Sequence, residues 1–280
     1  MQRAEIIAEI GINHDGDIKK ALELVKTANL CGADVVKFQK REPELAVPRH
    51  MWESEKETPW GDVMSYIDYK KAIEFSYDEY VAIDSLCWEL SICWTASVWD
   101  VPSAMFIIQN FPHVPFIKIP SAKLTDTELL GTVSSSGKPI YLSTGMSYIE
   151  EIDTAVELLG NLGTELSLLH CHSAYPADMD EINLSQIAAL RDRYGHDIPV
   201  GYSNHTVSPL PCIVAAALGA SIIEAHITLH REDRGTDHAS SLEPKGFQLM
   251  SREITKLPEY CGGFPKTVLE SEKPYRDKLR

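Results

Sequence analysis

Short β-branched segments alternate with helical segments along nearly all of this 280-residue chain, and this alternation predicts a TIM (β/α)8 barrel. Eight such pairs fit within about 260 residues, a usual size for this fold. Polar side chains recur at or just after the predicted strands, where such barrels carry their active sites. A doubly wound sheet is the alternative fold, although it rarely needs eight regular units.

The predicted strands are short runs rich in Val, Ile and other apolar residues. They span residues 5–10, 34–38, 91–95, 116–119, 139–142, 165–170, 198–202 and 221–225. A segment with helical spacing of apolar residues follows each strand. The predicted helices span residues 17–31, 77–90, 102–110, 125–135, 148–160, 183–194, 207–218 and 245–257. Strand–helix alternation of this kind implies parallel strands joined by right-handed crossovers.

Local signals support several helix ends. Gly32 and Gly219 each follow a predicted helix, where glycine tolerates the left-handed backbone of a C-cap. Pro102 stands in the first turn of its helix, where no N–H is needed. Asp126 and Glu128 open another helix, where negative charge meets the positive end of the helix dipole.

The predicted barrel covers residues 1–260 as one domain, because no shift in composition marks a second one. Residues 39–76 form a polar excursion with three prolines, too long for an ordinary connection and therefore expected to be functional. Residues 261–280 are expected to form a polar tail.

Composition excludes several function classes. Lysine and arginine number 26 against 41 acidic residues, and the net charge of −15 disfavours nonspecific binding to nucleic acid or acidic membranes. No apolar run reaches the roughly 18 residues that cross a bilayer. Six scattered cysteines without a C-x-x-C pair, and an N-terminus without an apolar leader, predict a cytoplasmic location.

Two lysines interrupt apolar strands and are expected to point into the barrel mouth. Lys37 stands in VVKF and Lys118 in FIKI, and a buried ammonium group needs an anionic partner. The partner is either Glu9 or Glu224 in a structural ion pair, or an anionic substrate. Further donors to a phosphate or carboxylate stand in hydroxyl-rich turns after the strands, at Ser121, Ser143, Thr144 and Ser203.

Two histidines follow the last two predicted strands, which are neighbours in the barrel. His205 and His226 are therefore either satisfied polar core residues or ligands that share one divalent metal. Asp237 or Glu9 could complete the coordination shell, and this nitrogen and oxygen set suits Mn, Fe, Co or Zn better than Ca. The sequence lacks a G-x-S-x-G turn, a dinucleotide fingerprint and a P-loop.

Eight motifs, in this order along nearly the whole chain, resemble the sialic acid synthase family. They are AEIGINHDGD (8–17), ADVVKFQ (33–39), IKIPSA (117–122), KPIYLSTGM (138–146), LLHCHSAYP (168–176), GYSNHT (201–206), ALGASIIEAHIT (217–228) and RGTDHASSLEP (234–244). The resemblance implies a TIM barrel that condenses phosphoenolpyruvate with an open-chain aldose such as N-acetylmannosamine. The implied product is a 3-deoxy-2-ulosonic acid.

The resemblance also implies roles for individual residues. Those that hold the phosphate and carboxylate of phosphoenolpyruvate are Lys37, Ser97, Lys118, Ser121, Ser173 and Ser203. His205 and His226 match the ligands of a divalent metal, usually manganese, with magnesium or cobalt as alternatives. Glu9, Tyr175 and Asp237 match positions that face the sugar. The implied catalytic residues are Glu9, Lys37, Lys118 and His205.

Three departures from the family pattern bear on the acceptor sugar. Lys123 replaces a glutamate that contacts the sugar in the family, and Ser173 stands where asparagine is frequent. Family members also commonly carry a C-terminal antifreeze-like domain, which is not expected here because the sequence stops near residue 280. We therefore expect an acceptor other than the usual sugar, or recognition of its N-acetyl group by the 39–76 excursion.

The leading hypothesis is thus a metal-dependent synthase that uses phosphoenolpyruvate and a sugar aldehyde. A metal-dependent sugar aldolase or epimerase on the same barrel is the alternative, and a catalytically inactive binding subunit is a third reading. The sequence leaves the oligomeric state open, with a homodimer as one option.

Overall fold

A computed structural model describes residues 2–195, 197–263 and 265–280 of the chain. Within them, eight parallel strands close into a barrel, which confirms the predicted fold class. The strands neighbour one another in the order β1-β10-β9-β8-β7-β6-β5-β2. They are β1 (Glu5–Gly11), β2 (Val35–Lys40), β5 (Cys93–Val98), β6 (Ile117–Ile119), β7 (Ile140–Ser143), β8 (Leu166–Cys171), β9 (Val200–Asn204) and β10 (Ile222–His226).

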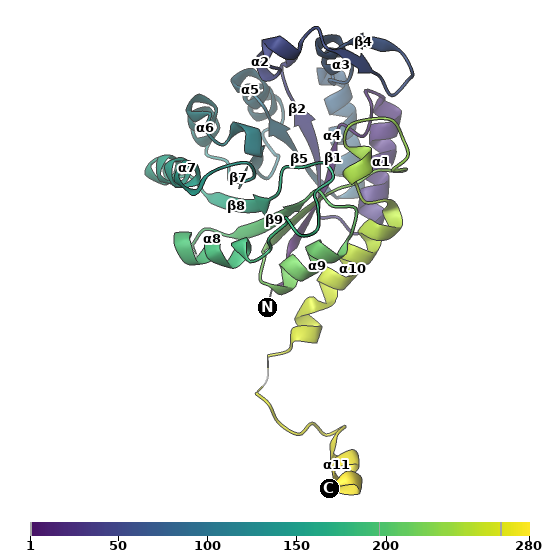
Figure 1. The fold of residues 1–280 in the computed structure, drawn as a ribbon, viewed down its shortest axis with the longest axis vertical. Coiled ribbons are helices and arrows are strands. Elements are labelled where there is room, and N and C mark those ends of the chain that lie inside the picture. Colours follow the sequence, from purple (N-terminus) through teal and green to yellow (C-terminus); the bar gives the residue numbers. More distant parts are fainter. Residues whose placement is uncertain (1, 196, 264) are drawn as a thin grey trace.

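A ring of helices surrounds the barrel, one after each strand (Figure 1). They are α1 (Ile18–Leu30), α4 (Tyr77–Leu90), α5 (Val101–Asn110), α6 (Thr127–Ser134), α7 (Ile149–Asn161), α8 (Gln186–Tyr194), α9 (Leu210–Ala217) and α10 (Pro244–Cys261). Each predicted helix overlaps one of these. Their apolar faces and the outward faces of the strands form the main hydrophobic core.

A second, smaller cluster fills the barrel interior. It comprises Ile7, Val35, Phe116, Leu169 and Ile222, and each of these side chains is nearly inaccessible to solvent. Alternate residues of a strand share one face, so the residues two positions further along also point into the barrel. Those residues are Glu9, Lys37, Lys118, Cys171 and Glu224. The polar layer of the mouth therefore rests on an apolar layer.

The polar excursion after β2 folds into short elements at the barrel mouth. They are α2 (Pro43–Ala46), η1 (Arg49–Met51), β3 (Glu55–Glu57), β4 (Val63–Ser65) and α3 (Tyr66–Ala72). Strands β3 and β4 pair antiparallel as a separate hairpin. Tyr69 and Ile73 pack against Ile12 in a small hydrophobic cluster, which fixes α3 beside the turn after β1.

Five predicted strand starts lie one residue too early, and two lie two residues too early, each of these two for a local reason. Ser91 takes a left-handed backbone conformation with φ of 55° and closes α4, so β5 begins at Cys93 and extends to Val98. Pro199 has no N–H for the ladder, and β9 begins at Val200. The shifts place Ser97 within β5 and bring β9 to its end immediately before His205.

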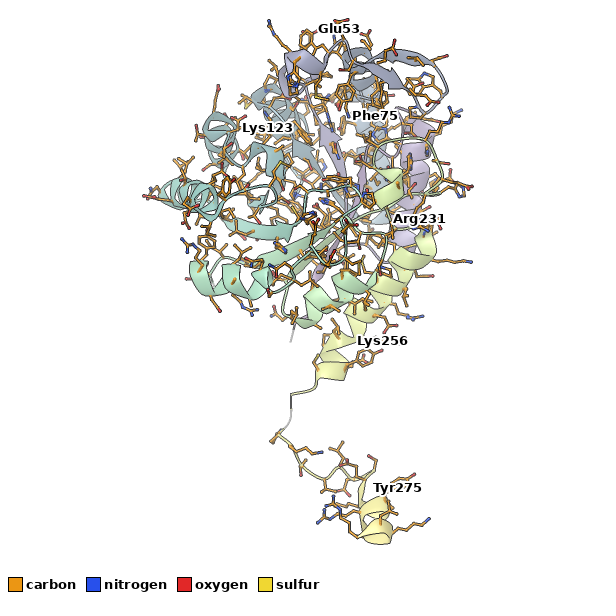
Figure 2. All side chains as sticks on the ribbon, viewed as in Figure 1. Glu53, Phe75, Lys123, Arg231, Lys256 and Tyr275 are labelled. Carbon is orange, nitrogen blue, oxygen red and sulfur yellow. The ribbon has the colours of Figure 1, made fainter. Side chains whose placement is uncertain are left out.

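The chain after α10 ends in a short helix, α11 (Lys273–Leu279), which lies apart from the barrel (Figure 1). Its side chains, including the labelled Tyr275, are exposed (Figure 2). No helix within the described ranges combines the length and the apolar character needed to cross a membrane.

Candidate active site

A cavity of about 400 Å³ opens at the C-terminal ends of the barrel strands. Eleven of the twelve site residues expected from the sequence line it. They are Glu9, Lys37, Ser97, Lys118, Ser121, Ser173, Tyr175, Ser203, His205, His226 and Asp237. The exception is Lys123 in the short helix η2 (Ser121–Lys123), which is not among the lining residues and whose amine lies 3.3 Å from Asp126 Oδ2.

The deepest part of the cavity is a buried ion-pair network. Lys37 Nζ lies 2.6 Å from Glu9 Oε2 and 3.5 Å from Glu224 Oε2. Lys118 Nζ lies 3.6 Å from Glu224 Oε1. Glu9 and Glu224 are thus the ion-pair partners of the two lysines. The lysines and the glutamates also line the cavity, where a ligand can reach them.

Hydroxyl groups complete the network and hold its charges in place. Lys37 donates to Ser97 Oγ and Lys118 donates to Ser143 Oγ, each at a distance of 2.7 Å. Ser203 donates to Glu224 Oε1 over 2.8 Å. Such charge-assisted bonds fix the rotamers of groups that would otherwise be costly to bury.

The network also determines the charge states. Burial alone raises the pKa of Glu224, but Lys118 and Lys37 outweigh burial and hold that pKa well below its usual range. Burial alone would lower the pKa of Lys37, but the negative charges of Glu224 and Glu9 outweigh burial and raise that pKa. For Lys118 the burial effect prevails and its pKa is lowered.

A turn of small residues brings three polar side chains together beside Lys118. The Gly145 N–H donates to Ser121 Oγ over 3.0 Å, and Ser121 Oγ lies 3.1 Å from Cys171 Sγ. Ser173 Oγ is buried without a hydrogen-bond partner among the described residues. A Cβ at Gly145 would lie 2.7 Å from Cys171 Sγ and would overlap Ser173 Oγ. The glycine is therefore required for this arrangement.

His205 and His226 face each other at the edge of the cavity, with ring centroids 5.5 Å apart. His205 Nδ1 donates to the His172 carbonyl over 2.6 Å, which fixes the tautomer and leaves Nε2 free to accept. Burial, together with His226, lowers the pKa of His205 to about 3. The Tyr175 ring packs 4.1 Å from the His205 ring.

His226 Nδ1 is buried without a hydrogen-bond partner among the described residues, and Asp237 Oδ2 lies 3.9 Å from it. The neutral His205 ring beside the unsatisfied, buried nitrogen of His226 suits a borderline divalent cation. The described part of the chain nevertheless brings together no group of three or more His, Cys, Asp or Glu side chains around one metal position. A metal here would thus take two protein ligands, with the other positions open to water or substrate.

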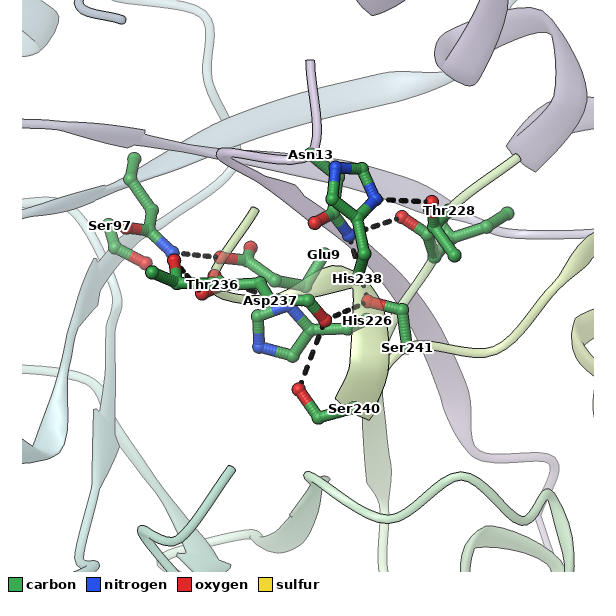
Figure 3. Close-up of polar contacts among 12 residues, drawn as sticks. Glu9, Asn13, Ser97, His226, Thr228, Thr236, Asp237, His238, Ser240 and Ser241 are labelled. Carbon is green, nitrogen blue, oxygen red and sulfur yellow. Dashed lines mark hydrogen bonds and ion pairs between the residues drawn. The ribbon is translucent and has the colours of Figure 1, made fainter. Parts of the chain in front are cut away.

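The loop after β10 holds Asp237 beside His226 (Figure 3). Ser240 and Ser241 donate to the Asp237 carbonyl over 3.0 and 2.7 Å. Asn13, from the turn after β1, donates to Ser241 Oγ over 2.8 Å. These bonds fix the backbone of Asp237, and the Thr236 hydroxyl donates to its carboxylate at a distance of 2.8 Å.

The structure adds cavity residues that were not among the expected site residues. Glu224 and Ser143 belong to the ion-pair network. From the sequence, Glu224 is predicted only as a possible partner of the lysines and Ser143 only as a possible donor to a bound anion. Arg41 and Lys70 were missed. Strand alternation from Lys37 could have found Arg41, but no pattern in the sequence places the 39–76 excursion over the barrel mouth.

Comparison with protein families matches residues 24–266 to the family described as NeuB. The chain is similar to N-acetylneuraminate-9-phosphate synthase of Mus musculus, with 34% identity over 98% of this chain and 76% of that protein. It is also similar to N,N'-diacetyllegionaminic acid synthase of Legionella pneumophila, with 33% identity over 98% of this chain and 78% of that protein.

Among solved structures, the fold is similar to N-acetylneuraminic acid synthetase from Leptospira borgpetersenii in complex with citrate. The TM-score is 0.86 and the sequence identity is 30%. The match covers 99% of this chain and 93% of that one.

Proposed function

Because the chain belongs to the NeuB family, which confirms the resemblance read from its motifs, we propose that it is a nonulosonate synthase. It condenses phosphoenolpyruvate with an open-chain aldose to give a 3-deoxy-2-ulosonic acid and phosphate. The relatives compared above make nonulosonic acids, so a sugar aldolase or epimerase is not favoured. The observation that carries the proposal is the buried Lys37 and Lys118 pair in a cavity that also holds the buried, unpartnered hydroxyl of Ser173.

Phosphoenolpyruvate occupies the deep end of the cavity in this proposal. Its phosphate and carboxylate together carry about three negative charges, so several cations and donors are needed to bind it. Lys37 and Lys118 supply the cations. The donors are Ser97, Ser121, Ser173 and Ser203, and the free Ser173 hydroxyl supports an anion at this place.

In the reaction, carbon 3 of the enol phosphate attacks the aldehyde carbon, and the aldehyde oxygen takes up a proton. Water then adds at carbon 2 and loses a proton, for which Glu9 is the base. The tetrahedral intermediate breaks its carbon–oxygen bond to phosphate and becomes the 2-keto acid. Lys37 and Lys118 stabilise the charge on the departing phosphate.

His205 and His226 would hold a divalent metal, and we propose manganese, with magnesium or cobalt as alternatives. When bound, the metal supplies Lewis acidity for an oxygen of the substrate. The chain itself contributes the fixed tautomer of His205 and the neutral state of that ring, both of which leave a nitrogen lone pair available. Glu9, Tyr175 and Asp237 lie on the acceptor side of the cavity.

Six free thiols, four of them buried, agree with a reducing compartment, and we place the enzyme in the cytoplasm. The test of function is phosphate release from phosphoenolpyruvate with Mn and a panel of aldoses. We expect release with at least one 2-acetamido aldose and its loss in Lys118→Met. The control is Lys71→Met on the exposed face of α3. Absence of release with every aldose would refute the synthase.

A further inference from the structure

The residue after Asp237 is a histidine that the proposed reaction and the metal site do not use. Asp237 lines the cavity, whereas His238 is completely buried and its ring lies beside Thr228 (Figure 3). His238 begins the short helix η3 (His238–Ser240), where the loop that follows β10 ends. Buried ring nitrogens need hydrogen-bond partners, so the partners of this ring show what it does.

Each ring nitrogen of His238 has a partner on a different segment. Nδ1 lies 2.7 Å from Thr228 Oγ1, at the start of the loop after β10. Nε2 lies 3.2 Å from Asp15 Oδ2, in the turn after β1, and donates its proton there because a carboxylate only accepts. The ring therefore joins the two ends of the loop and ties both to the turn after β1.

A second connection holds the middle of the same loop. Lys20 of α1 lies 2.7 Å from Asp15 Oδ2 and 2.9 Å from Asp233 Oδ2. Asp15 thus holds the loop twice, once through His238 and once through Lys20. The backbone of Asp15 is left-handed, with φ of 54°, a conformation that is uncommon for a residue with a side chain.

The loop backbone packs directly on the His238 ring at Gly235. A Cβ at Gly235 would lie 2.6 Å from His238 Cδ2 and 3.3 Å from Asp15 Oδ1, so this position has no room for a side chain. Thr236 and Asp237 follow immediately and line the cavity. The place of the Asp237 carboxylate therefore depends on how the loop rests on this ring.

We propose that His238, held by Asp15, is a positioning residue that sets the Asp237 carboxylate against the acceptor sugar. The inference rests on the proposed synthase activity and adds a residue to the acceptor side of its site. Lys37 and Lys118 bond to other groups in the deep part of the cavity and share no hydrogen bond with His238 among the described residues. The phosphoenolpyruvate end should therefore be insensitive to the loss of His238.

The experiment measures kcat and KM for both substrates, with the aldose that supports the fastest phosphate release. Two variants each keep one of the two bonds of the ring. The amide nitrogen of His238→Gln can take the place of Nε2 and reach Asp15, whereas that of His238→Asn takes the place of Nδ1 and reaches only Thr228.

His238→Asn should raise KM for the aldose by about 10- to 100-fold, because a displacement of about 1 Å in a substrate-binding group can cost about 100-fold. His238→Gln should restore most of the wild-type value, and KM for phosphoenolpyruvate should not change in either variant. The matched control is His230→Asn, an exposed histidine in the same loop, which should keep both KM values.

A double-mutant cycle with Asp237→Asn separates positioning from a general loss of stability. If His238 acts through Asp237, adding His238→Asn to Asp237→Asn leaves KM for the aldose unchanged, and effects that multiply in the double variant overturn the inference. Should His238→Asn fail to fold, Lys20→Met removes the second connection from a partly exposed position and should raise the same KM by a smaller factor.

The outcomes distinguish this inference from the proposed function. A wild-type KM for the aldose in His238→Asn and Lys20→Met, or an equal rise in KM for both substrates, overturns the positioning role while leaving the synthase intact. Absence of phosphate release from the wild-type enzyme with every aldose refutes the synthase, and the inference with it.

Discussion

The backbone N–H of Gly145 donates to Ser121 Oγ over 3.0 Å, and this bond draws the turn after β7 against the hydroxyl groups of the cavity. A methyl group on Gly145 would press on Cys171 and Ser173. The neighbouring side chains therefore have their positions only because residue 145 has no side chain.

Gly145→Ala should accordingly impair the use of phosphoenolpyruvate. A displacement of about 1 Å in a substrate-binding group can cost about 100-fold, and we expect a loss of about 10- to 100-fold in kcat/KM for phosphoenolpyruvate. Steady-state phosphate release measures it. The matched control is Gly131→Ala in α6, where an added Cβ meets nothing within 4 Å. Equal kinetics for the two variants would contradict the prediction.

Glu224→Gln should destabilise the fold. The substitution keeps the shape of the side chain but leaves Lys118 and Lys37 with a smaller counter-charge in a buried site. Removing one partner of a buried ion pair costs about 3–5 kcal/mol, and urea denaturation will show it. Glu253→Gln, at the surface, should leave the free energy of unfolding essentially unchanged. A stability loss as small as that of the control would show that the lysines do not depend on Glu224.

His205→Ala and His226→Ala should each weaken manganese binding by about 10- to 100-fold, as loss of metal-site groups commonly does. Equilibrium dialysis followed by metal analysis measures this without reference to activity. His113→Ala removes an exposed histidine that pairs with Asp84, and it should bind metal as the wild type does. Unaltered manganese affinity in both site variants would argue against these two ligands.

The pH dependence should report the state of Lys70. Burial, with Arg41 next in effect, lowers the pKa of Lys70 to about 7, so the free enzyme loses this positive charge as the pH rises above 7. With an anionic acceptor, kcat/KM should therefore fall between pH 7 and 9, because that ratio follows ionisations of the free enzyme. Lys70→Arg stays charged throughout and should flatten the decline. If kcat/KM declines equally in Lys70→Arg, the ionisation of another group causes the decline.

The sequence predicts the barrel well because strands and helices are encoded by local periodicity. It misplaces the start of β5 because the left-handed backbone at Ser91 is a C-cap without glycine. Strand alternation in the sequence likewise predicts that Glu9, Lys37 and Lys118 lie together at the mouth of the barrel. The deep part of the site is therefore predictable.

The outer part of the site, which the 39–76 excursion forms, is less predictable from the sequence. Lys70 belongs to a helix whose position depends on the packing of the excursion, through Tyr69 and Ile73, and no periodic signal carries that information. Lys123, in contrast, is not among the residues that line the cavity. Its place in a motif predicted contact with the sugar, but the short helix η2 turns its amine toward Asp126 instead.

The apolar layer beneath Glu9, Lys37, Lys118 and Glu224 has a kinetic consequence. Because the cluster of Ile7, Val35, Phe116, Leu169 and Ile222 fills the barrel below the ion pairs, the cavity is a dead end in that direction. Whatever binds deepest must enter before the other substrate and depart after the other product. With phosphoenolpyruvate as the proposed deepest ligand, the layering of the barrel requires it to enter before the acceptor sugar.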